Sequence, residues 1–287
     1  MRETPSPAIR AADIQGEFVT DAVRVRLRLP ISCAELWPAV SDPIQIAQWM
    51  GDLDGPLSGP SPVRLDFGDG DFFAIDPLGT TPGRTQVFAW RFLGVGPTDE
   101  ITWQLAESEN GCVFAVRDHH ASRTREEAVE MVEGWSDFLG RLAGYVTTGR
   151  RTRYHWRHEI DGAATLCDPD APLLEEPELY RWLPVQQDGT GRTFQLDGEG
   201  TPSAFGVVDW RLGPGRELSF ATVIPGAARP PACTVRLLQR GQRDTRIRFA
   251  HTGWAARDLG LPEEQCLALR RRFATTWQAA LSSIERC

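Results

Sequence analysis

The sequence predicts an α+β fold of two domains, each an antiparallel sheet with one long helix at its C-terminal end. Three observations lead to this prediction. The chain has 287 residues, more than the ~100 to 200 of an ordinary domain. A Trp-Arg pair followed by a Gly/Pro turn occurs twice, at Trp90 and Trp210. Each half also ends in a long stripe of apolar residues at helical spacing. We expect an N-terminal extension at residues 1–19, a first domain at 20–149 and a more divergent second domain at 150–287.

In the first domain, apolar and charged residues alternate over 23–29, which predicts a half-buried strand. Ser32 and Glu35 then form a capping-box pattern that predicts a short helix over 34–40. A proline opens a second short helix, which we expect to end near Trp49.

An antiparallel meander and a closing helix complete this domain. Gly, Pro and Asn turns separate its alternating segments, which we expect at 63–67, 71–75, 86–93, 100–107 and 112–118. The closing helix is predicted over 125–147. Its apolar stripe consists of Val132, Trp135, Leu139, Leu142 and Val146.

The second domain repeats this order of parts. We expect a short helix at 177–183 and a closing helix that begins at Pro262. Its strands are predicted at 154–160, 193–196, 204–212, 217–224, 234–240 and 245–251.

Composition excludes several functions. All 31 basic residues are arginine, so Schiff-base, pyridoxal-phosphate and P-loop lysine chemistry have no residue to use. The net charge is −8 and no basic stripe occurs, so nucleic acid is not an expected partner. No segment resembles a membrane span or a signal peptide, and we expect a cytoplasmic protein.

The six cysteines are scattered without paired spacing, which we interpret as reduced thiols. His155 and His158 would lie on opposite faces of a strand and could not share a metal ion. We therefore expect neither a metal nor a cofactor.

Several segments resemble the START-like, SRPBCC superfamily, and most of all the bacterial relatives of the activator of the heat-shock-protein-90 ATPase. The matching segments are residues 25–37, Trp49, 83–103, 133–142 and, more loosely, 249–254. The resemblance implies a helix-grip fold in each domain, a curved antiparallel sheet wrapped around its long C-terminal helix. It also implies a cavity between sheet and helix, which members of the superfamily use for apolar molecules.

The densest polar cluster is Arg117, Asp118, His119 and His120, at the end of the last strand of the first domain. Strand alternation places Arg117 and His119 on one face and the other two on the opposite face, so an Asp/His pair could face the cavity as acid and base. The alternative is a solvated turn at the edge of the sheet.

Two candidates lie in the second domain. His251 occupies the corresponding strand end, and Asp209 interrupts an apolar strand where the first copy has Ala89. A carboxylate in an apolar cavity has a raised pKa and can serve as a general acid or base. Alternatively, Asp209 faces outward as an ordinary surface residue.

Aromatic residues are numerous, with 10 tryptophans and 13 phenylalanines. Several share strand faces and could line a cavity that stacks on a planar ligand, although any single ring could equally be core. The candidate ligand-binding residues are Trp49, Phe73, Phe88, Trp90, Trp103, Trp135, Trp182 and Trp210.

Our leading hypothesis is a cofactor-independent biosynthetic enzyme, a polyketide-type cyclase, aromatase or dehydratase that transfers protons in an aromatic cavity. The alternative is a non-catalytic carrier of a hydrophobic ligand, or a co-chaperone-like regulator. The expected partner is a small hydrophobic or polyketide-like molecule, and a protein partner is also possible. An enzyme should hold an acid/base pair at the inner end of its pocket, whereas a carrier's pocket should be apolar throughout.

Overall fold

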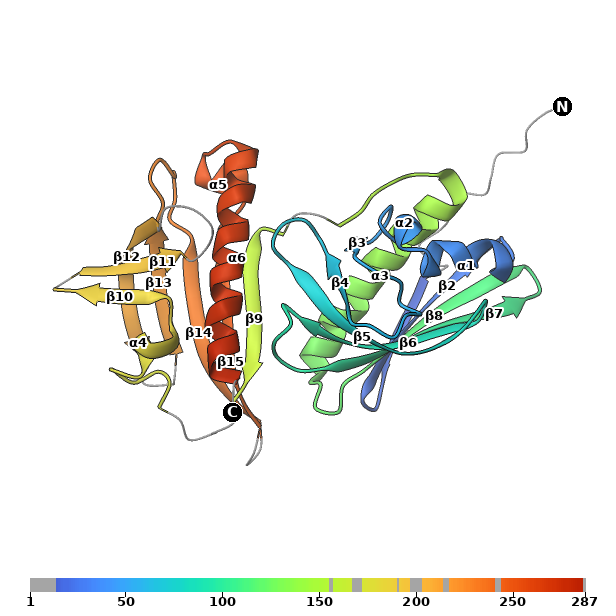
Figure 1. The fold of residues 1–287 in the computed structure, drawn as a ribbon, viewed down its shortest axis with the longest axis horizontal. Helices are drawn as coiled ribbons and strands as arrows, with labels where there is room; N and C mark the ends of the chain where they lie inside the picture. Colours follow the sequence, from blue (N-terminus) through green and yellow to red (C-terminus); the bar gives the residue numbers. More distant parts are fainter. Residues whose placement is uncertain are drawn as a thin grey trace. The chain divides into compact units, whose positions relative to one another are not determined.

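The computed structural model describes residues 14–154, 157–166, 172–189, 191–196, 203–213, 217–240 and 244–285 (Figure 1). The chain forms two compact units. Unit 1 comprises Met1–Gly68, Phe72–Arg91 and Thr98–His155, and unit 2 comprises Asp69–Asp71, Phe92–Pro97 and Trp156–Cys287. Each is an antiparallel sheet with helices, so the predicted α+β class is confirmed.

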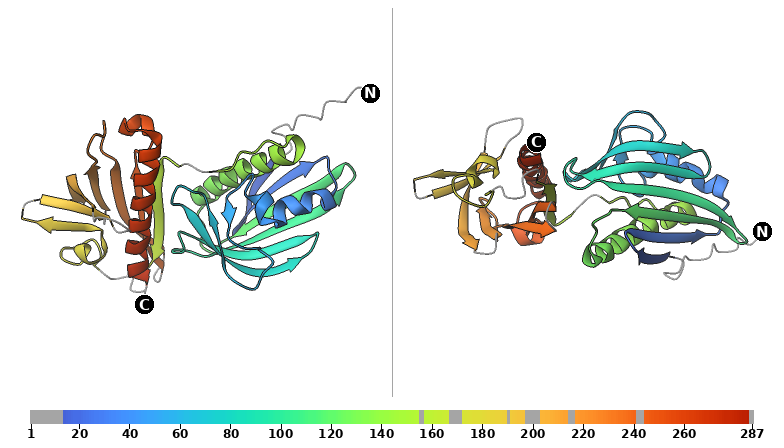
Figure 2. Two further views of the ribbon diagram at one scale, coloured as in Figure 1. Left: turned by 45° about the horizontal axis from the view of Figure 1, so that its top comes forward. Right: turned by 90° about the horizontal axis from the view of Figure 1, so that it is seen from below.

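Unit 1 is built on an eight-stranded sheet in the order β1-β2-β8-β7-β6-β5-β4-β3. Its strands are β1 (Ile14–Val19), β2 (Ala22–Leu29), β3 (Asp52–Leu53), β4 (Val63–Asp66), β5 (Phe72–Thr81), β6 (Thr85–Phe92), β7 (Asp99–Ser108) and β8 (Gly111–His119). Its helices are α1 (Cys33–Ser41), α2 (Pro43–Ile46) and α3 (Arg125–Thr148). The long helix α3 packs against β1 and β2 along one face of the sheet (Figure 2).

Local sequence explains these elements. Ser32 and Glu35 form the expected capping box at the start of α1, and Thr124 and Glu127 form a second one at α3. Along β2 the valine and leucine side chains are buried and the arginines are exposed, as the alternation predicts.

Two expectations for unit 1 need correction. Residues 14–19 belong to the sheet, because β1 pairs with β2 from Ile14↔Leu27 to Val19↔Ala22. Cys33 and Cys112 form a disulfide that joins α1 to β8, so the expectation that all cysteines are reduced is wrong for this pair. Cys233 and Cys266 are free and buried, whereas Cys167 and Cys287 lie outside the described residues.

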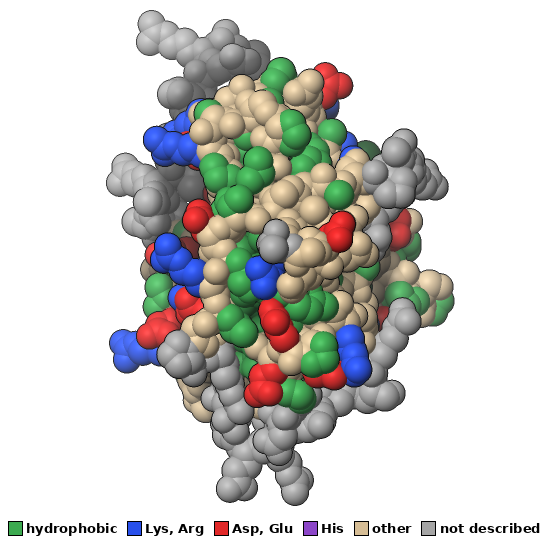
Figure 3. Space-filling model, turned by 90° about the vertical axis from the view of Figure 1, so that its left-hand side faces the viewer, with side chains coloured by type: hydrophobic (Ala, Val, Ile, Leu, Met, Phe, Trp, Pro, Cys, Tyr) green, Lys and Arg blue, Asp and Glu red, His purple; other side chains and the backbone are tan. Residues whose placement is uncertain are grey.

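Unit 2 is built on a seven-stranded sheet in the order β10-β11-β12-β13-β14-β15-β9. Its strands are β9 (Glu159–Thr165), β10 (Val185–Asp188), β11 (Gly191–Leu196), β12 (Ser203–Gly213), β13 (Glu217–Val223), β14 (Ala232–Arg240) and β15 (Asp244–Thr252). Its helices are α4 (Leu179–Trp182), α5 (Ala256–Leu259) and α6 (Glu263–Glu285). On one outer face of this unit, hydrophobic side chains are dispersed among polar and charged ones (Figure 3).

The first strand of unit 2 starts later than the predicted segment at 154–160, since β9 begins at Glu159. Its buried positions include Gly162 and Ala164, which are too small to show an apolar alternation. A Cβ at Gly162 would lie 2.9 Å from Phe249 and 3.0 Å from Leu281, so close packing requires glycine there.

Sheet order also corrects the alignment of the two copies. Counted from β2 and β9, the order β2-β8-β7-β6-β5 matches β9-β15-β14-β13-β12. Trp90 therefore lies on β6, whereas Trp210 lies on β12, the counterpart of β5. The two Trp-Arg segments are displaced by one strand, and Asp209 is not the counterpart of Ala89.

Within the described ranges, no helix combines the length and the apolar character that a membrane span requires.

Candidate functional site

Six of the eight candidate ligand-binding aromatics come together in the core of unit 1. Trp49, Phe88, Trp90, Trp103 and Trp135 are buried, and Phe73 packs against them. Three rings form a stack. Phe73 and Trp90 have centroids 3.9 Å apart and planes 12° apart, and Trp90 and Trp135 have centroids 5.1 Å apart and planes 10° apart.

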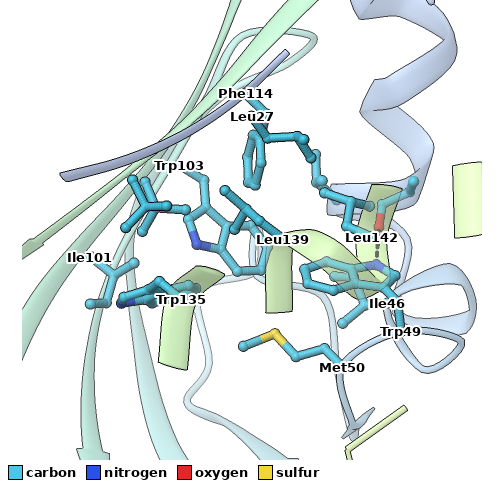
Figure 4. Packing of buried hydrophobic residues seen from close by; sticks show 14 of the residues in the cluster. Leu27, Ile46, Trp49, Met50, Ile101, Trp103, Phe114, Trp135, Leu139 and Leu142 are labelled. Carbon is cyan, nitrogen blue, oxygen red and sulfur yellow. Dashed lines mark hydrogen bonds between the residues drawn. The ribbon is translucent and has the colours of Figure 1, made fainter. Parts of the chain in front are cut away.

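Trp103 lies at the centre of this cluster, within reach of Trp49 on one side and Trp135 on the other (Figure 4). Its ring meets that of Phe88 edge to face, with centroids 5.3 Å apart. Both stacked and edge-to-face pairs stabilise an aromatic core.

A closed apolar space, which we call the void, adjoins this cluster. All of its lining residues are apolar: Ile46, Met50, Leu53, Leu57, Leu65, Ile75, Phe88, Trp90 and Trp103. It has no room for the centre of a water molecule. The expected aromatic-lined cavity is therefore closed in this structure, and its side chains must move before a ligand can enter.

The indole N–H groups divide these tryptophans into two classes. Trp49 Nε1 donates to the Ala39 carbonyl at 2.9 Å, and Trp135 Nε1 donates to Asp118 Oδ2 at 2.8 Å (Figure 4 shows the first of these bonds). The buried Nε1 atoms of Trp90 and Trp103 have no hydrogen-bond partner among the residues that the structure describes. Both of these unpaired rings line the void.

One wall of the void is a segment rich in Gly, Pro and Ser, residues 54–62, which we call the cover segment. Leu57 is its one buried side chain, and it lines the void. The hydrogen bonds that the structure gives for the segment are few: Arg64 N donates to Asp54 Oδ1 at 2.7 Å, Asp54 N donates to the Arg64 carbonyl at 3.2 Å, and Gly59 N donates to the Pro56 carbonyl at 3.1 Å. Few buried contacts and few internal bonds characterise segments that open locally.

Asp118 is the buried member of the polar cluster at the end of β8. Arg123 donates to its Oδ1 at 2.5 Å and Trp135 donates to its Oδ2 at 2.8 Å. Arg123 also pairs with Asp99 at 3.1 Å. Both oxygens of Asp118 are thus engaged in holding the loop after β8 and helix α3 to the sheet.

The other three members of the cluster face away from the core. Arg117 pairs with Glu100 at 3.7 Å, and His119 Nε2 lies 2.9 Å from Asp21 Oδ2. The hydrogen bond from His119 lowers the pKa of Asp21. His120 Nδ1 accepts from the backbone of Ser122 at 3.2 Å. These three side chains therefore fit the alternative of a solvated turn at the edge of the sheet, because they are partly exposed and bonded to surface neighbours.

His251 lies in the aromatic core of unit 2. Trp277 Nε1 donates to its Nδ1 at 3.3 Å, which places the imidazole proton on Nε2. Phe194, Trp254 and Phe273 surround the ring. Burial lowers the pKa of His251 to about 3, with a small opposing effect from the Pro231 carbonyl, so the imidazole is neutral near pH 7.

The two units share one arrangement at this position. In each, a buried polar side chain on the strand before the closing helix accepts a hydrogen bond from a tryptophan of that helix. The pair is Asp118 and Trp135 in unit 1 and His251 and Trp277 in unit 2. The correspondence of strand ends expected from the sequence is therefore present, with an acid in one copy and a base in the other.

The remaining candidates of unit 2 do not form a catalytic group. Asp209 is exposed, at a bulge in β12 with φ of 54°, so the surface alternative describes it and it does not face an apolar cavity. Trp182 is buried and donates to the Leu173 carbonyl at 2.9 Å. Trp210 is half-buried, and its ring stacks on Phe220. His155 lies outside the described residues.

Sequence reasoning missed a buried ionic cluster in unit 2. The Arg270 guanidinium is fully buried and donates to Asp71 Oδ2 at 2.8 Å, and Arg157 donates to the same oxygen at 3.2 Å. Burial raises the pKa of Asp71 to about 6, although both arginines act in the opposite direction. The sequence does carry a sign of this cluster. Arg270 lies four residues after Cys266 and three before Phe273, so helical spacing places it on the buried apolar face of α6, where an arginine is unusual.

No three His, Cys, Asp or Glu side chains lie close enough to hold a metal ion in the described part of the chain.

A second hollow of about 310 Å³, open to solvent, lies on the outer face of the unit 1 sheet. It is lined by Gln15, Arg26, Arg28, Gln104, Ala106, Val113 and Ala115.

Comparison with known proteins gives a strong similarity to DynU16. The crystal structure of DynU16, described as a protein in the dynemicin biosynthetic locus, is 41% identical and has a TM-score of 0.86. The match covers 93% of this chain and 98% of DynU16. CalU16 of Micromonospora echinospora is 23% identical, with a TM-score of 0.39, over 45% of this chain and 77% of CalU16. Protein CV1439 of Chromobacterium violaceum is 19% identical, with a TM-score of 0.38, over 45% and 99%. No protein-family model and no curated protein matches the chain.

Proposed function

Because the chain belongs to the same family as DynU16, we propose that it serves a biosynthetic pathway by binding a small, apolar, ring-bearing molecule inside unit 1. The observation that carries this proposal is the void beside the aromatic cluster, whose lining is apolar throughout. Concave apolar surfaces with a few polar groups are the usual sites for small ligands.

The lining favours binding over proton transfer. No carboxylate or imidazole lines the void. The buried acid that contacts the ring stack through Trp135, Asp118, is paired with Arg123. A general acid or base must reach the proton that it moves, and Asp118 is not among the residues that line the void.

Entry of a ligand requires the void to enlarge. Strands β4 to β7 form one wall, and each is hydrogen-bonded into the sheet. The cover segment forms another, and it is anchored in the void by Leu57 alone among its side chains. We therefore propose that outward movement of the cover segment withdraws Leu57 and admits the ligand between Leu57 and the rings.

The test uses fluorene, an uncharged fused-ring hydrocarbon, in equilibrium dialysis against the full chain. We expect a single saturable site in the wild type. Ile75→Phe adds a ring to the void from β5 and should abolish binding by occupying the ligand's place, and its thermal unfolding is compared with that of the wild type to show that it folds. Val113→Phe adds the same ring in the open outer hollow and should leave binding unchanged. Absence of binding to the wild type, or equal binding by both variants, would overturn the proposal.

A second candidate is the cyclase, aromatase or dehydratase expected from the sequence. The observation that favours it is a fully buried carboxylate, Asp118, one ring away from Trp90. If the ligand moves Trp135, the carboxylate gains access to it. Turnover of a bound polyketide that Asp118→Asn abolishes while binding persists would establish this function. Unchanged turnover in Asp118→Asn would refute it.

A further inference from the structure

We infer that the ligand of unit 1 is a planar, uncharged ring system bearing a carbonyl oxygen, which accepts hydrogen bonds from the indole N–H groups of Trp90 and Trp103. This inference rests on the proposed binding function and specifies the class of ligand. Its starting observation is that both N–H groups are buried beside the void without a partner among the described residues.

Leaving a buried donor unpaired is unfavourable, and native proteins rarely do so without a reason. The neighbouring tryptophans of the same core show the ordinary solution. Trp49 donates to a backbone carbonyl and Trp135 to a carboxylate. The two unpaired rings are the two tryptophans that line the void, so the unused donors and the apolar space coincide. An acceptor oxygen on the ligand would satisfy them.

The rings also restrict the ligand's shape. Trp90 stacks against both Phe73 and Trp135, whose planes lie 12° and 10° from its own, so a ligand that stacks on Trp90 must be flat and must take the place of one of these rings. The ring of Phe88 stands edge-on to Trp103 with an interplanar angle of 85°. A flat ring system can stack on one surface and meet the other edge to face, and both geometries are favourable for aromatic pairs.

Charge restricts the ligand further. No charged side chain lines the void. A buried charge without a counter-ion is strongly unfavourable, so neither a carboxylate nor an ammonium group suits the site. A neutral carbonyl oxygen supplies the acceptor without that penalty, and a ketone conjugated to a ring keeps the molecule planar.

The experiment compares 9-fluorenone with fluorene, which share a planar fused-ring shape and differ in the carbonyl oxygen. Equilibrium dialysis measures both dissociation constants for the full chain and for three variants. Trp90→Phe and Trp103→Phe each remove an unpaired N–H. Trp49→Phe is the matched control, since it removes a tryptophan of the same cluster whose N–H is already paired.

We expect the wild type to bind 9-fluorenone about ten- to a hundredfold more tightly than fluorene, as for two net hydrogen bonds. This preference should fall by about three- to tenfold in Trp90→Phe and in Trp103→Phe, each of which loses one of the two bonds, and persist in Trp49→Phe. Loss of ring volume affects both probes alike, so the ratio isolates the N–H group. Equal binding of the two probes by the wild type would overturn this inference and leave the proposed function standing. Failure of both probes to bind would overturn the proposed function itself.

A second measurement needs no variant. In protein labelled with ¹⁵N at the tryptophan indoles, 9-fluorenone should move two N–H proton resonances downfield, as expected for newly formed hydrogen bonds, and fluorene should not. Identical responses to the two probes would contradict the inference even if a tryptophan variant failed to fold.

Discussion

Replacement of His251 by phenylalanine should change how the stability of unit 2 depends on pH. His251 is fully buried, and its pKa falls from 6.5 to about 3 in the folded protein. The unfolded chain binds a proton at this residue below about pH 6.5, whereas the folded protein does so only near pH 3. Between these values the unfolded state binds more protons, so the contribution of His251 to stability is complete above about pH 6.5 and is lost as the pH falls.

The size of the effect follows from the same shift. Each pKa unit corresponds to about 1.4 kcal/mol, so the wild type should lose about 2 kcal/mol between about pH 7.5 and about pH 5 through His251. Asp71 titrates in the opposite sense, because its pKa is raised to about 6 and acid then favours the folded state. Only the difference between wild type and His251→Phe therefore isolates the histidine.

The assay is hydrogen exchange of the α6 amides in increasing urea, which reports on the opening of unit 2 by itself. Near neutral pH the variant should be the less stable protein, because Trp277 Nε1 loses its acceptor. Near pH 5 that gap should shrink by about 2 kcal/mol. Parallel pH dependences of the two proteins would refute the buried, neutral imidazole.

Three further predictions concern unit 1. Changing Cys33 and Cys112 to alanine should cost about 4 kcal/mol in urea unfolding, because the disulfide spans a sequence separation of 79 residues; no change from wild type under oxidising conditions would contradict it. Arg123→Met should lower the free energy of unfolding by about 3 to 5 kcal/mol, measured by thermal unfolding, because it leaves the Asp118 carboxylate unpaired. Adding Asp118→Asn to this variant should restore part of the loss. If the costs of the two substitutions simply add, the prediction is wrong. Leu57→Ala should speed both association and dissociation of fluorene about tenfold in stopped-flow measurements, since it weakens the closed cover segment; unaltered rates would exclude the cover segment as the entry route.

Local patterns predicted most of the fold. The capping box at Ser32 and Glu35 was found as expected, and the α3 stripe lies within Arg125–Thr148. Alternation alone also placed Asp118 on the opposite face from Arg117 and His119. These features depend on near neighbours in the chain, so the residue order is sufficient to predict them.

Features that depend on contacts between distant residues were not predicted. Cys33 and Cys112 meet because the start of α1 lies against the start of β8, and their spacing gives no sign of it. The partner that neutralises Asp118 is Arg123, in a loop whose path the sequence does not specify. The number of aromatic residues likewise predicted an aromatic interior, but whether those rings enclose a space or fill it depends on how they pack.

A crystal structure of the full chain grown with 9-fluorenone would show whether the interior of unit 1 receives a planar ligand. We expect the ligand between Leu57 and the rings of Trp90 and Trp103, with its oxygen facing the indole N–H groups and Leu57 displaced. A ligand found only in the open hollow beside Arg26 and Arg28, or an unchanged aromatic core at saturating probe, would contradict this expectation.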